Sequence, residues 1–125
     1  MKHRVLVIED NPLNLELIVD LLESRDFSVL QACNAEEGLR LAREAAPDLV
    51  LMDLSLPGMD GLAATQALKA DPATRPVPVI ALTAHAMKGD ENAALAAGCD
   101  GYLTKPINTR TFPDQVIRFI GSLPN

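Results

Sequence analysis

Acidic side chains stand directly after two of the apolar runs in this sequence. Glu9 and Asp10 follow the run 5–8, and Asp53 follows the run 49–52. If these runs are parallel strands, their carboxyl ends meet at one edge of a sheet, where the chemistry of such folds is found. Carboxylates held together repel one another by about 1 kcal/mol at ~4 Å in water and ~4 kcal/mol at an effective dielectric of about 20. Such a cluster persists when one pKa rises or when a cation binds.

A hydroxyl and an ammonium follow the last two apolar runs. Thr83 and Ala84 come after one of them, and Lys105 and Pro106 come after the other. The acidic ligands are all oxygens with no His or Cys beside them, so they favour a hard cation, and Mg²⁺ also keeps waters that a phosphate can replace. Lys105 is then expected to face an anion to which Thr83 donates a hydrogen bond. Together these groups predict a phosphoryl-transfer site in which Asp53 is the nucleophile.

Each of these residues also has an ordinary structural interpretation. Asp53 taken alone could be a turn or cap residue, and Lys105 taken alone could be a solvated surface charge. Glu9 and Asp10 taken alone could cap the helix that follows. Their joint placement at successive strand ends is what favours the functional interpretation.

Five short apolar runs, separated by helical patterns, must position these groups. The runs at 5–8, 49–52 and 77–82 lack period-2 alternation, which is typical of strands buried on both faces. The runs at 28–30 and 101–103 are shorter and weaker, which favours positions towards the edges of the sheet. Five strand–helix units predict a parallel sheet with helices on both faces.

Two apolar stripes at helical spacing indicate the first and last helices. Their members are Leu17, Ile18, Leu21 and Leu22 in the first, and Phe112, Val116, Phe119 and Ile120 in the second. Pro113 is tolerated only in a first turn, so the last helix is expected to start near Asn108 or Thr109.

Capping residues support the helix boundaries. Asn11 before Pro12 is typical of a helix start. Asn34 with Glu37 has the spacing of a capping box. Gly98 follows an alanine-rich stretch and is expected to end it as a left-handed cap.

Composition excludes several classes of protein. The 125 residues suit one domain, and the formal net charge of −6 argues against nucleic-acid binding. No apolar run approaches the ~18 residues that a membrane span needs, and the N-terminal run is too short for a signal peptide. Cys33 and Cys99 are isolated, so each is expected to be a small buried hydrophobe rather than part of a disulfide or zinc site. The chain is expected to be soluble and cytoplasmic.

At its polar positions the sequence resembles the receiver domain of two-component response regulators, the CheY-like family. The matching motifs, which extend over essentially the whole chain, are Val-Ile-Glu9-Asp10-Asn, Leu-Met-Asp53-Leu-Ser-Leu-Pro57-Gly-Met-Asp-Gly61, Ala-Leu-Thr83-Ala84 and Tyr102-Leu-Thr-Lys105-Pro106. The resemblance implies an α/β, flavodoxin-like, doubly wound five-stranded parallel sheet of order 2-1-3-4-5, forming a single receiver domain over residues 1–125. The segment 83–90 is most similar to receivers of hybrid kinases and of stand-alone cell-division regulators.

The resemblance also implies a role for each site residue. Asp53 is expected to accept a phosphoryl group from a phosphohistidine on a sensor histidine kinase or a histidine phosphotransfer protein. Mg²⁺ is expected to be bound by Glu9, Asp10 and Asp53, with the backbone carbonyl of Ser55 completing the protein ligands. Lys105 is expected to pair with the phosphoryl oxygens. The protein is then a phosphoacceptor that assists its own phosphorylation and dephosphorylation, and not an enzyme in the usual sense.

A conformational switch follows from these roles. Phosphorylation of Asp53 adds charge and acceptor oxygens. Thr83 is expected to move towards them and vacate space into which Tyr102 rotates, and Ala84, next to Thr83, is expected to belong to the same switch. The fourth helix, fifth strand and fifth helix border both residues, so this face is the expected binding surface for a downstream protein or for a second copy in a homodimer. The family further implies a cis peptide before Pro106.

Three alternatives remain open at this stage. A Mg²⁺-dependent aspartyl phosphatase resembles Asp-x-Asp after the first strand, where this chain has Glu9-Asp10. A flavodoxin needs a phosphate loop that these acids would repel, and the chain has few aromatic residues to hold a flavin. A degenerate receiver that serves only for docking usually lacks an acceptor, acid or lysine position that this chain has. The chain could also be a stand-alone receiver or a piece of a larger regulator, with the start at Met1 favouring the former.

Overall fold

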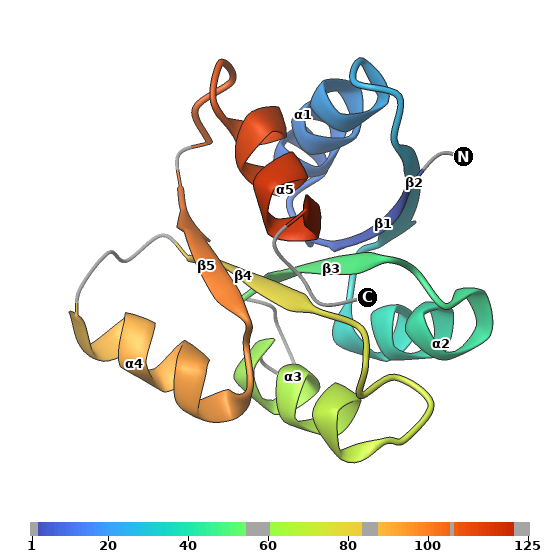
Figure 1. Cartoon of the computed structure of the whole chain (residues 1–125), viewed down its shortest axis with the longest axis vertical. Helices are drawn as coiled ribbons and strands as arrows, with labels where there is room; N and C mark the ends of the chain where they lie inside the picture. The colour runs from blue at the N-terminus through green and yellow to red at the C-terminus, as the bar shows by residue number, and fades with distance from the viewer. Residues whose placement is uncertain (1–2, 55–60, 84–87, 106, 122–125) are drawn as a thin grey trace.

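A computed structural model of the protein describes residues 3–54, 61–83, 88–105 and 107–121. Within these residues five strands alternate with five helices. The elements are β1 (Arg4–Ile8), α1 (Pro12–Glu23), β2 (Ser28–Ala32), α2 (Ala35–Ala45), β3 (Leu49–Asp53), α3 (Gly61–Ala70), β4 (Val79–Thr83), α4 (Lys88–Ala97), β5 (Gly101–Thr104) and α5 (Phe112–Gly121). All strand pairs are parallel and the sheet order is β2-β1-β3-β4-β5 (Figure 1), which confirms the predicted fold.

Helices cover both faces of the sheet. Figure 1 shows α1 and α5 on one side, with α2, α3 and α4 on the other. Alternate side chains of β1 enter the two cores, since Val5 and Val7 pack towards Ile18 of α1 while Leu6 and Ile8 pack with the alanines of α2 and α3. The apolar residues 5–8, 49–52 and 79–82 of the central strands are therefore buried on both faces of the sheet, as the sequence pattern predicts.

The burial of the strands follows their order in the sheet. All five residues of β3 and of β4 are buried, whereas β2 and β5 are largely half-buried. The short runs at 28–30 and 101–103 thus lie in the edge strands, as predicted. The described residues include no helix long and apolar enough to cross a bilayer.

Side-chain caps start two of the helices where the sequence places them. Oδ1 of Asn11 accepts hydrogen bonds from two backbone N–H groups in the first turn of α1, and Pro12 is the first helical residue. Oδ1 of Asn34 accepts from the backbone N–H of Glu37 at 2.8 Å. Gly98 ends α4 with a φ of 109°, in the region that favours glycine.

The predicted start of the last helix is wrong by three or four residues. α5 begins at Phe112 rather than at Asn108 or Thr109, although Pro113 does lie in its first turn. Asn108 instead closes a turn before the helix, because its side chain accepts from the backbone N–H of Arg110 at 3.0 Å and its carbonyl accepts from that of Phe112 at 2.9 Å. An Asx turn and a helix cap use the same residue type, so the sequence does not distinguish them.

Three side chains are more exposed than predicted. Leu17 is 37% exposed and Leu21 half-buried, so the buried stripe of α1 runs through Ile18, Val19 and Leu22. Cys33 is exposed, because it follows the edge strand β2 where the chain leaves the sheet, whereas Cys99 is buried as expected.

Candidate functional site

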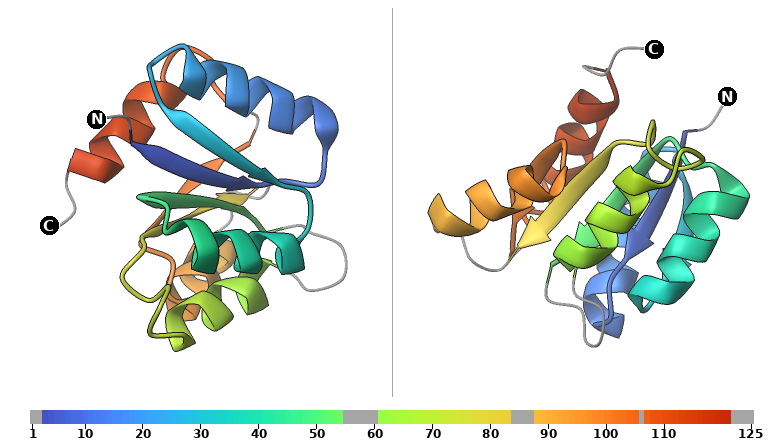
Figure 2. Two further views of the ribbon diagram at one scale, coloured as in Figure 1. Left: turned by 90° about the vertical axis from the view of Figure 1, so that its right-hand side faces the viewer. Right: turned by 90° about the horizontal axis from the view of Figure 1, so that it is seen from below.

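The polar residues predicted to act together follow the carboxyl ends of β1, β3, β4 and β5. Because these strands are parallel neighbours, their ends open on the same edge of the sheet, and Figure 2 shows them running in one direction. Glu9 and Asp10 follow β1, Asp53 is the last residue of β3, and Thr83 is the last residue of β4. Lys105 follows β5. Topology alone therefore brings residues from distant parts of the chain together.

Three carboxylates form a tight cluster at this edge. One oxygen from each of Glu9, Asp10 and Asp53 lies within 4.8 Å of the others. Glu9 and Asp53 are each only 1% exposed, while Asp10 faces solvent. The backbone fixes Glu9, since its N–H donates to the carbonyl of Ala32 at 3.0 Å and so extends the ladder between β1 and β2. Glu9 and Asp53 therefore form the buried part of the cluster, and Asp10 leaves it open to solvent on one side.

Lys105 supplies positive charge to the buried part of the cluster. Its Nζ lies 2.9 Å from Oε2 of Glu9 and 3.2 Å from Oδ2 of Asp53, and its side chain is 15% exposed. Its backbone N–H donates to the carbonyl of Thr83 at 2.7 Å, which ties the segment after β5 to the end of β4. The structure therefore confirms that these acids and this ammonium lie at one site.

The protonation equilibria of the site are displaced. Burial raises the pKa of Glu9, and the neighbouring Asp53 raises it further, against the opposing effect of Lys105. Burial by itself lowers the pKa of Lys105, but its ion pairs with Glu9 and Asp53 outweigh burial and leave that pKa raised. The raised pKa of Lys105 favours its charged ammonium form, whereas the raised pKa of Glu9 disfavours its carboxylate form.

The donor set fits a hard divalent cation. Oε2 of Glu9 is fully buried and, apart from its ion pair with Lys105, has no hydrogen-bond partner among the described residues. Among the described residues, three carboxylates face one ammonium at this edge, so negative charge is in excess there. Oxygen ligands without His or Cys favour Mg²⁺ or Ca²⁺ over zinc.

The other predicted site residues lie around the cluster or outside the described residues. Thr83 is buried at the end of β4, and Tyr102 is half-buried in β5 opposite Ala81. Ser55 and Ala84 fall outside the described residues. So does Pro106, and with it the predicted cis peptide.

One residue beside the site was given no role by the sequence analysis. Gly61 begins α3, and its backbone packs directly against the backbone of Asp53 and Leu54. Its only sequence signal is a glycine at the end of the motif that carries Asp53, and a glycine at a helix start has several ordinary explanations.

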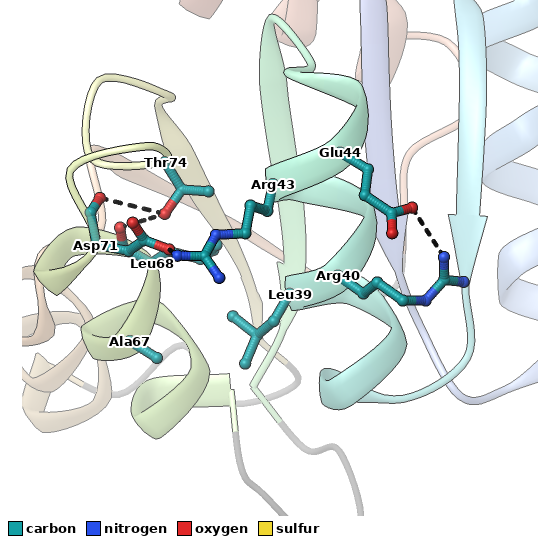
Figure 3. A pocket seen from close by; sticks show the side chains of 8 residues that line it. All are labelled: Leu39, Arg40, Arg43, Glu44, Ala67, Leu68, Asp71 and Thr74. Atoms are coloured by element: carbon teal, nitrogen blue, oxygen red, sulfur yellow. Dashed lines mark hydrogen bonds and ion pairs between the residues drawn. The ribbon is translucent and has the colours of Figure 1, made fainter.

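A groove of about 410 Å³ lies between α2 and α3, and Figure 3 shows its lining. Arg40 pairs with Glu44 at 2.9 Å, and Arg43 pairs with Asp71 across the groove at 3.2 Å. These charges neutralise one another, and none of the clustered acids lines the groove. The groove therefore lacks the uncompensated charge that marks the edge of the sheet.

Comparison with known proteins places the chain among signalling proteins. The model of the response regulator receiver domain matches residues 5–117. The polar-differentiation response regulator DivK of Brucella anthropi is 44% identical over 121 residues, which cover 97% of this chain and 98% of that protein.

Solved structures resemble the whole chain. The receiver domain of a sensor histidine kinase from Pseudomonas aeruginosa is 37% identical with a TM-score of 0.89, covers 98% of this chain and 100% of that one, and holds a magnesium ion coordinated in its active site cleft. The chemotaxis response regulator CheY4 of Vibrio cholerae, at 24% identity and a TM-score of 0.89, covers 94% of this chain and 98% of that one and shows the shared fold.

Proposed function

The chain belongs to the response regulator receiver domain family, and from that premise we propose that it is a phosphoryl-accepting switch over residues 1–125. Asp53 would take the phosphoryl group from a phosphohistidine of a sensor histidine kinase or a histidine phosphotransfer protein. The observation that carries this proposal is the placement of the Asp53 carboxylate between two further acids and the Lys105 ammonium.

The proposed transfer exchanges one bond for another. A carboxylate oxygen of Asp53 forms a bond to phosphorus as the bond from phosphorus to the imidazole nitrogen breaks, and the imidazole keeps the electron pair. Lys105, already 3.2 Å from Oδ2 of Asp53, would move its charge onto the phosphoryl oxygens. Thr83, at the neighbouring strand end, would donate a hydrogen bond to them. No substrate is turned over, so the chain acts as a phosphoacceptor and not as an enzyme in the usual sense.

Glu9, Asp10 and Asp53, with the backbone carbonyl of Ser55, are the residues that would hold Mg²⁺. The bound ion would supply positive charge against the carboxylates and the transferring oxygens. Two observations support this assignment: the excess of carboxylates over ammonium groups and the buried Oε2 of Glu9. The magnesium ion in the receiver domain of the Pseudomonas aeruginosa kinase supports it further.

The phosphoryl donor is proposed to dock over the first turns of α1. That helix begins two residues after Asp10, so a partner reaching Asp53 over the open side of the cluster passes it. Leu13 is 76% exposed and Leu17, one turn further, is 37% exposed. Exposed leucines at this spacing offer an apolar strip to a helical partner.

The output surface is proposed to be the face formed by α4, β5 and α5. Tyr102 and Leu103 of β5 line a shallow cavity of about 380 Å³ with Gln115, Arg118 and Phe119 of α5. Movement of Thr83 towards a phosphoryl group would change the packing of Tyr102 in the neighbouring strand, and this cavity would change shape. A downstream protein or a second copy of the chain would read that change, and no nucleic acid or membrane is involved in the proposal.

The decisive experiment follows labelled phosphoryl transfer to the purified chain. Wild type is expected to be labelled both by a phosphorylated histidine protein and by acetyl phosphate with Mg²⁺, whereas Asp53→Ala is expected to take up none from either. Leu13→Ser separates docking from chemistry, because it should slow transfer from the protein donor and leave acetyl phosphate labelling unchanged. Labelling of Asp53→Ala at the wild-type level would assign the acceptor role to another residue. A wild-type chain that takes up no label from either donor would favour a docking-only receiver.

A further inference from the structure

The first turn of α3 lies in backbone contact with the end of β3. A Cβ atom added at Gly61 would lie 2.7 Å from Cα of Leu54 and closer still to the carbonyl oxygen of Asp53. Both are main-chain atoms, so no side-chain rotation can relieve such a contact. The strand end that carries Asp53 and the start of α3 can approach this closely only without a side chain at position 61.

Hydrogen bonds fix both partners of this contact. On the strand side, Asp53 pairs with Leu82 in the sheet, and the N–H of Leu54 donates to the carbonyl of Leu82 at 3.0 Å. On the helix side, the buried hydroxyl of Thr65 donates to the carbonyl of Gly61 at 2.8 Å. The strand end is thus fixed to β4 and the first turn of α3 is fixed within its own helix, so each presents a defined backbone surface to the other.

The other described glycines with close neighbours differ in kind. A Cβ at Gly38 would meet the side chain of Ile8, and one at Gly101 would lie 2.7 Å from the ring of Phe119. One at Gly98 would meet the flexible side chain of Lys69. In each case the obstacle is a side chain, whereas at Gly61 it is the backbone of the residue proposed to accept the phosphoryl group.

We propose that Gly61 is a positioning residue of the metal site. Because it has no side chain, α3 can pack against the backbone of Asp53 and keep its carboxylate in place beside Glu9 and Asp10. The inference rests on the proposed function, since it takes the acidic cluster to bind Mg²⁺. Mg²⁺ requires near-octahedral geometry with oxygens at about 2.0–2.1 Å, whereas Ca²⁺ accepts irregular sites of about six to eight ligands at 2.3–2.6 Å. A small displacement of Asp53 should therefore weaken Mg²⁺ binding more than Ca²⁺ binding.

The test compares Mg²⁺ and Ca²⁺ affinities of wild type and Gly61→Ala, measured by titration of the full chain with amide chemical shifts as the signal. The variant is expected to bind Mg²⁺ at least about tenfold more weakly, as is usual when a residue supporting metal ligands is changed. Its Ca²⁺ affinity is expected to fall less, so the ratio of the two affinities changes. A general loss of stability would not shift this ratio.

Gly101→Ala is the matched control. It adds the same methyl group against a close neighbour, but at the start of β5, away from the strand ends that carry the acids. It is expected to lower the thermal midpoint while keeping the wild-type affinities for both ions.

If Gly61→Ala does not fold, Thr65→Val perturbs the first turn of α3 instead, because the Thr65 hydroxyl anchors the Gly61 carbonyl within that helix. Loss of its hydrogen bond to Gly61 is expected to weaken Mg²⁺ binding by about threefold, the scale of one neutral hydrogen bond. Wild-type affinity and ion selectivity in the folded variant would overturn the role of Gly61 and leave the phosphoacceptor proposal intact. A wild-type chain that binds neither ion would overturn both the metal site and this inference.

Discussion

The charged side chains are balanced in number at the amino edge of the sheet and unbalanced at its carboxyl edge. At the amino edge, Nζ of Lys69 donates to the carbonyl of Val77 at 2.9 Å and to Oδ2 of Asp100 at 3.0 Å. That same carboxylate oxygen accepts from the backbone N–H of Val79 at 2.8 Å. The Lys69 ammonium and the Asp100 carboxylate therefore pair one to one, and each also hydrogen-bonds to the backbone before or within β4.

At the carboxyl edge, three carboxylates face one ammonium in the part of the chain that the structure describes, and two of the acids are almost fully buried. Excess buried charge destabilises a fold, because the free energy lost on desolvating an ion is not offset when no opposite charge pairs with it. A network that serves only stability is therefore expected to have balanced charges. The contrast shows that the number of charges near a strand end says little about function. Their imbalance is what favours a binding site over a structural network at the carboxyl edge.

The largest effect is expected from removing the ammonium at each edge in turn. Lys105→Ala should leave the chain folded but abolish the response to a phosphoryl mimic, because the ammonium that would pair with the mimic and tie it to the end of β5 is lost. The measurement is the change in amide shifts at Thr83 and Tyr102 when beryllofluoride and Mg²⁺ are added. Lys69→Ala should keep that response in full and instead lower the free energy of unfolding by about 1–2 kcal/mol through its lost hydrogen bonds. Equal responses in the two variants would erase the distinction between the edges.

A second comparison removes one acid from each edge. Asp10→Ala should weaken Mg²⁺ binding by about 10–100-fold, because one of three clustered carboxylates is lost. Asp48, whose Oδ2 accepts from the backbone N–H of Arg4 at 2.7 Å, lies at the other edge, so Asp48→Ala should bind Mg²⁺ as wild type does. The check is a Mg²⁺ titration of both variants, and equal affinities would argue against the acidic cluster as the site.

A smaller effect is expected when the charge of Glu9 is removed and the free energy of unfolding is measured in the absence of metal. Because the folded-state pKa of Glu9 lies above its ordinary value of 4.5, the folded chain binds a proton more readily than the unfolded chain. The contribution of Glu9 to stability is therefore lost as the pH rises from about 4.5 through the raised pKa. In EDTA at pH 7, Glu9→Gln should be more stable than wild type, because the uncharged amide avoids the cost of ionising a buried carboxyl.

The pH series supplies the control for that substitution. The advantage of Glu9→Gln should shrink as the pH falls below the raised pKa, since protonated Glu9 and Gln are then both neutral. Denaturant unfolding of both proteins between pH 4 and pH 8 measures the difference. An advantage that does not change with pH would mean that the carboxylate charge is not its cause.

The smallest effect is expected at the amino edge, where stability should be adjustable without touching the site. Ala46 ends α2 with a φ of 47°, a conformation that costs a residue with a Cβ free energy and suits glycine. Ala46→Gly should raise the free energy of unfolding by about 0.5–1 kcal/mol. Mg²⁺ affinity and labelling of Asp53 should stay at wild-type values, and a change in either would show that the edges are coupled.

The apolar runs and the residues after them were sufficient to predict most of the site. Uninterrupted apolar strands can only be central in a parallel sheet, and the residues that follow them must meet at its carboxyl edge. Glu9, Asp53 and Lys105 were therefore predictable at one edge of the sheet from their positions, but as neighbours only with a strand order that places their strands side by side. The strand order 2-1-3-4-5 came from the family resemblance, because crossover connections of similar length allow several orders.

Features that depend on packing were predicted less well. Leu17 continues the apolar pattern of α1, yet it lies partly exposed, since the period of a pattern does not fix how wide a buried face is. Asn108 has the side chain of a helix cap but closes the turn before α5. The role proposed for Gly61 depends on a distance between two backbones, which no single residue type encodes.

The groups of the carboxyl edge come from residues 9–10, 53 and 105, so they are neighbours only while the chain is folded. An ion held by that edge has no equivalent site on the unfolded chain. Ion binding and folding are then thermodynamically linked, with a stabilisation that grows as RT ln(1 + [Mg²⁺]/Kd). The melting temperature of this protein would thus report the free Mg²⁺ concentration around it.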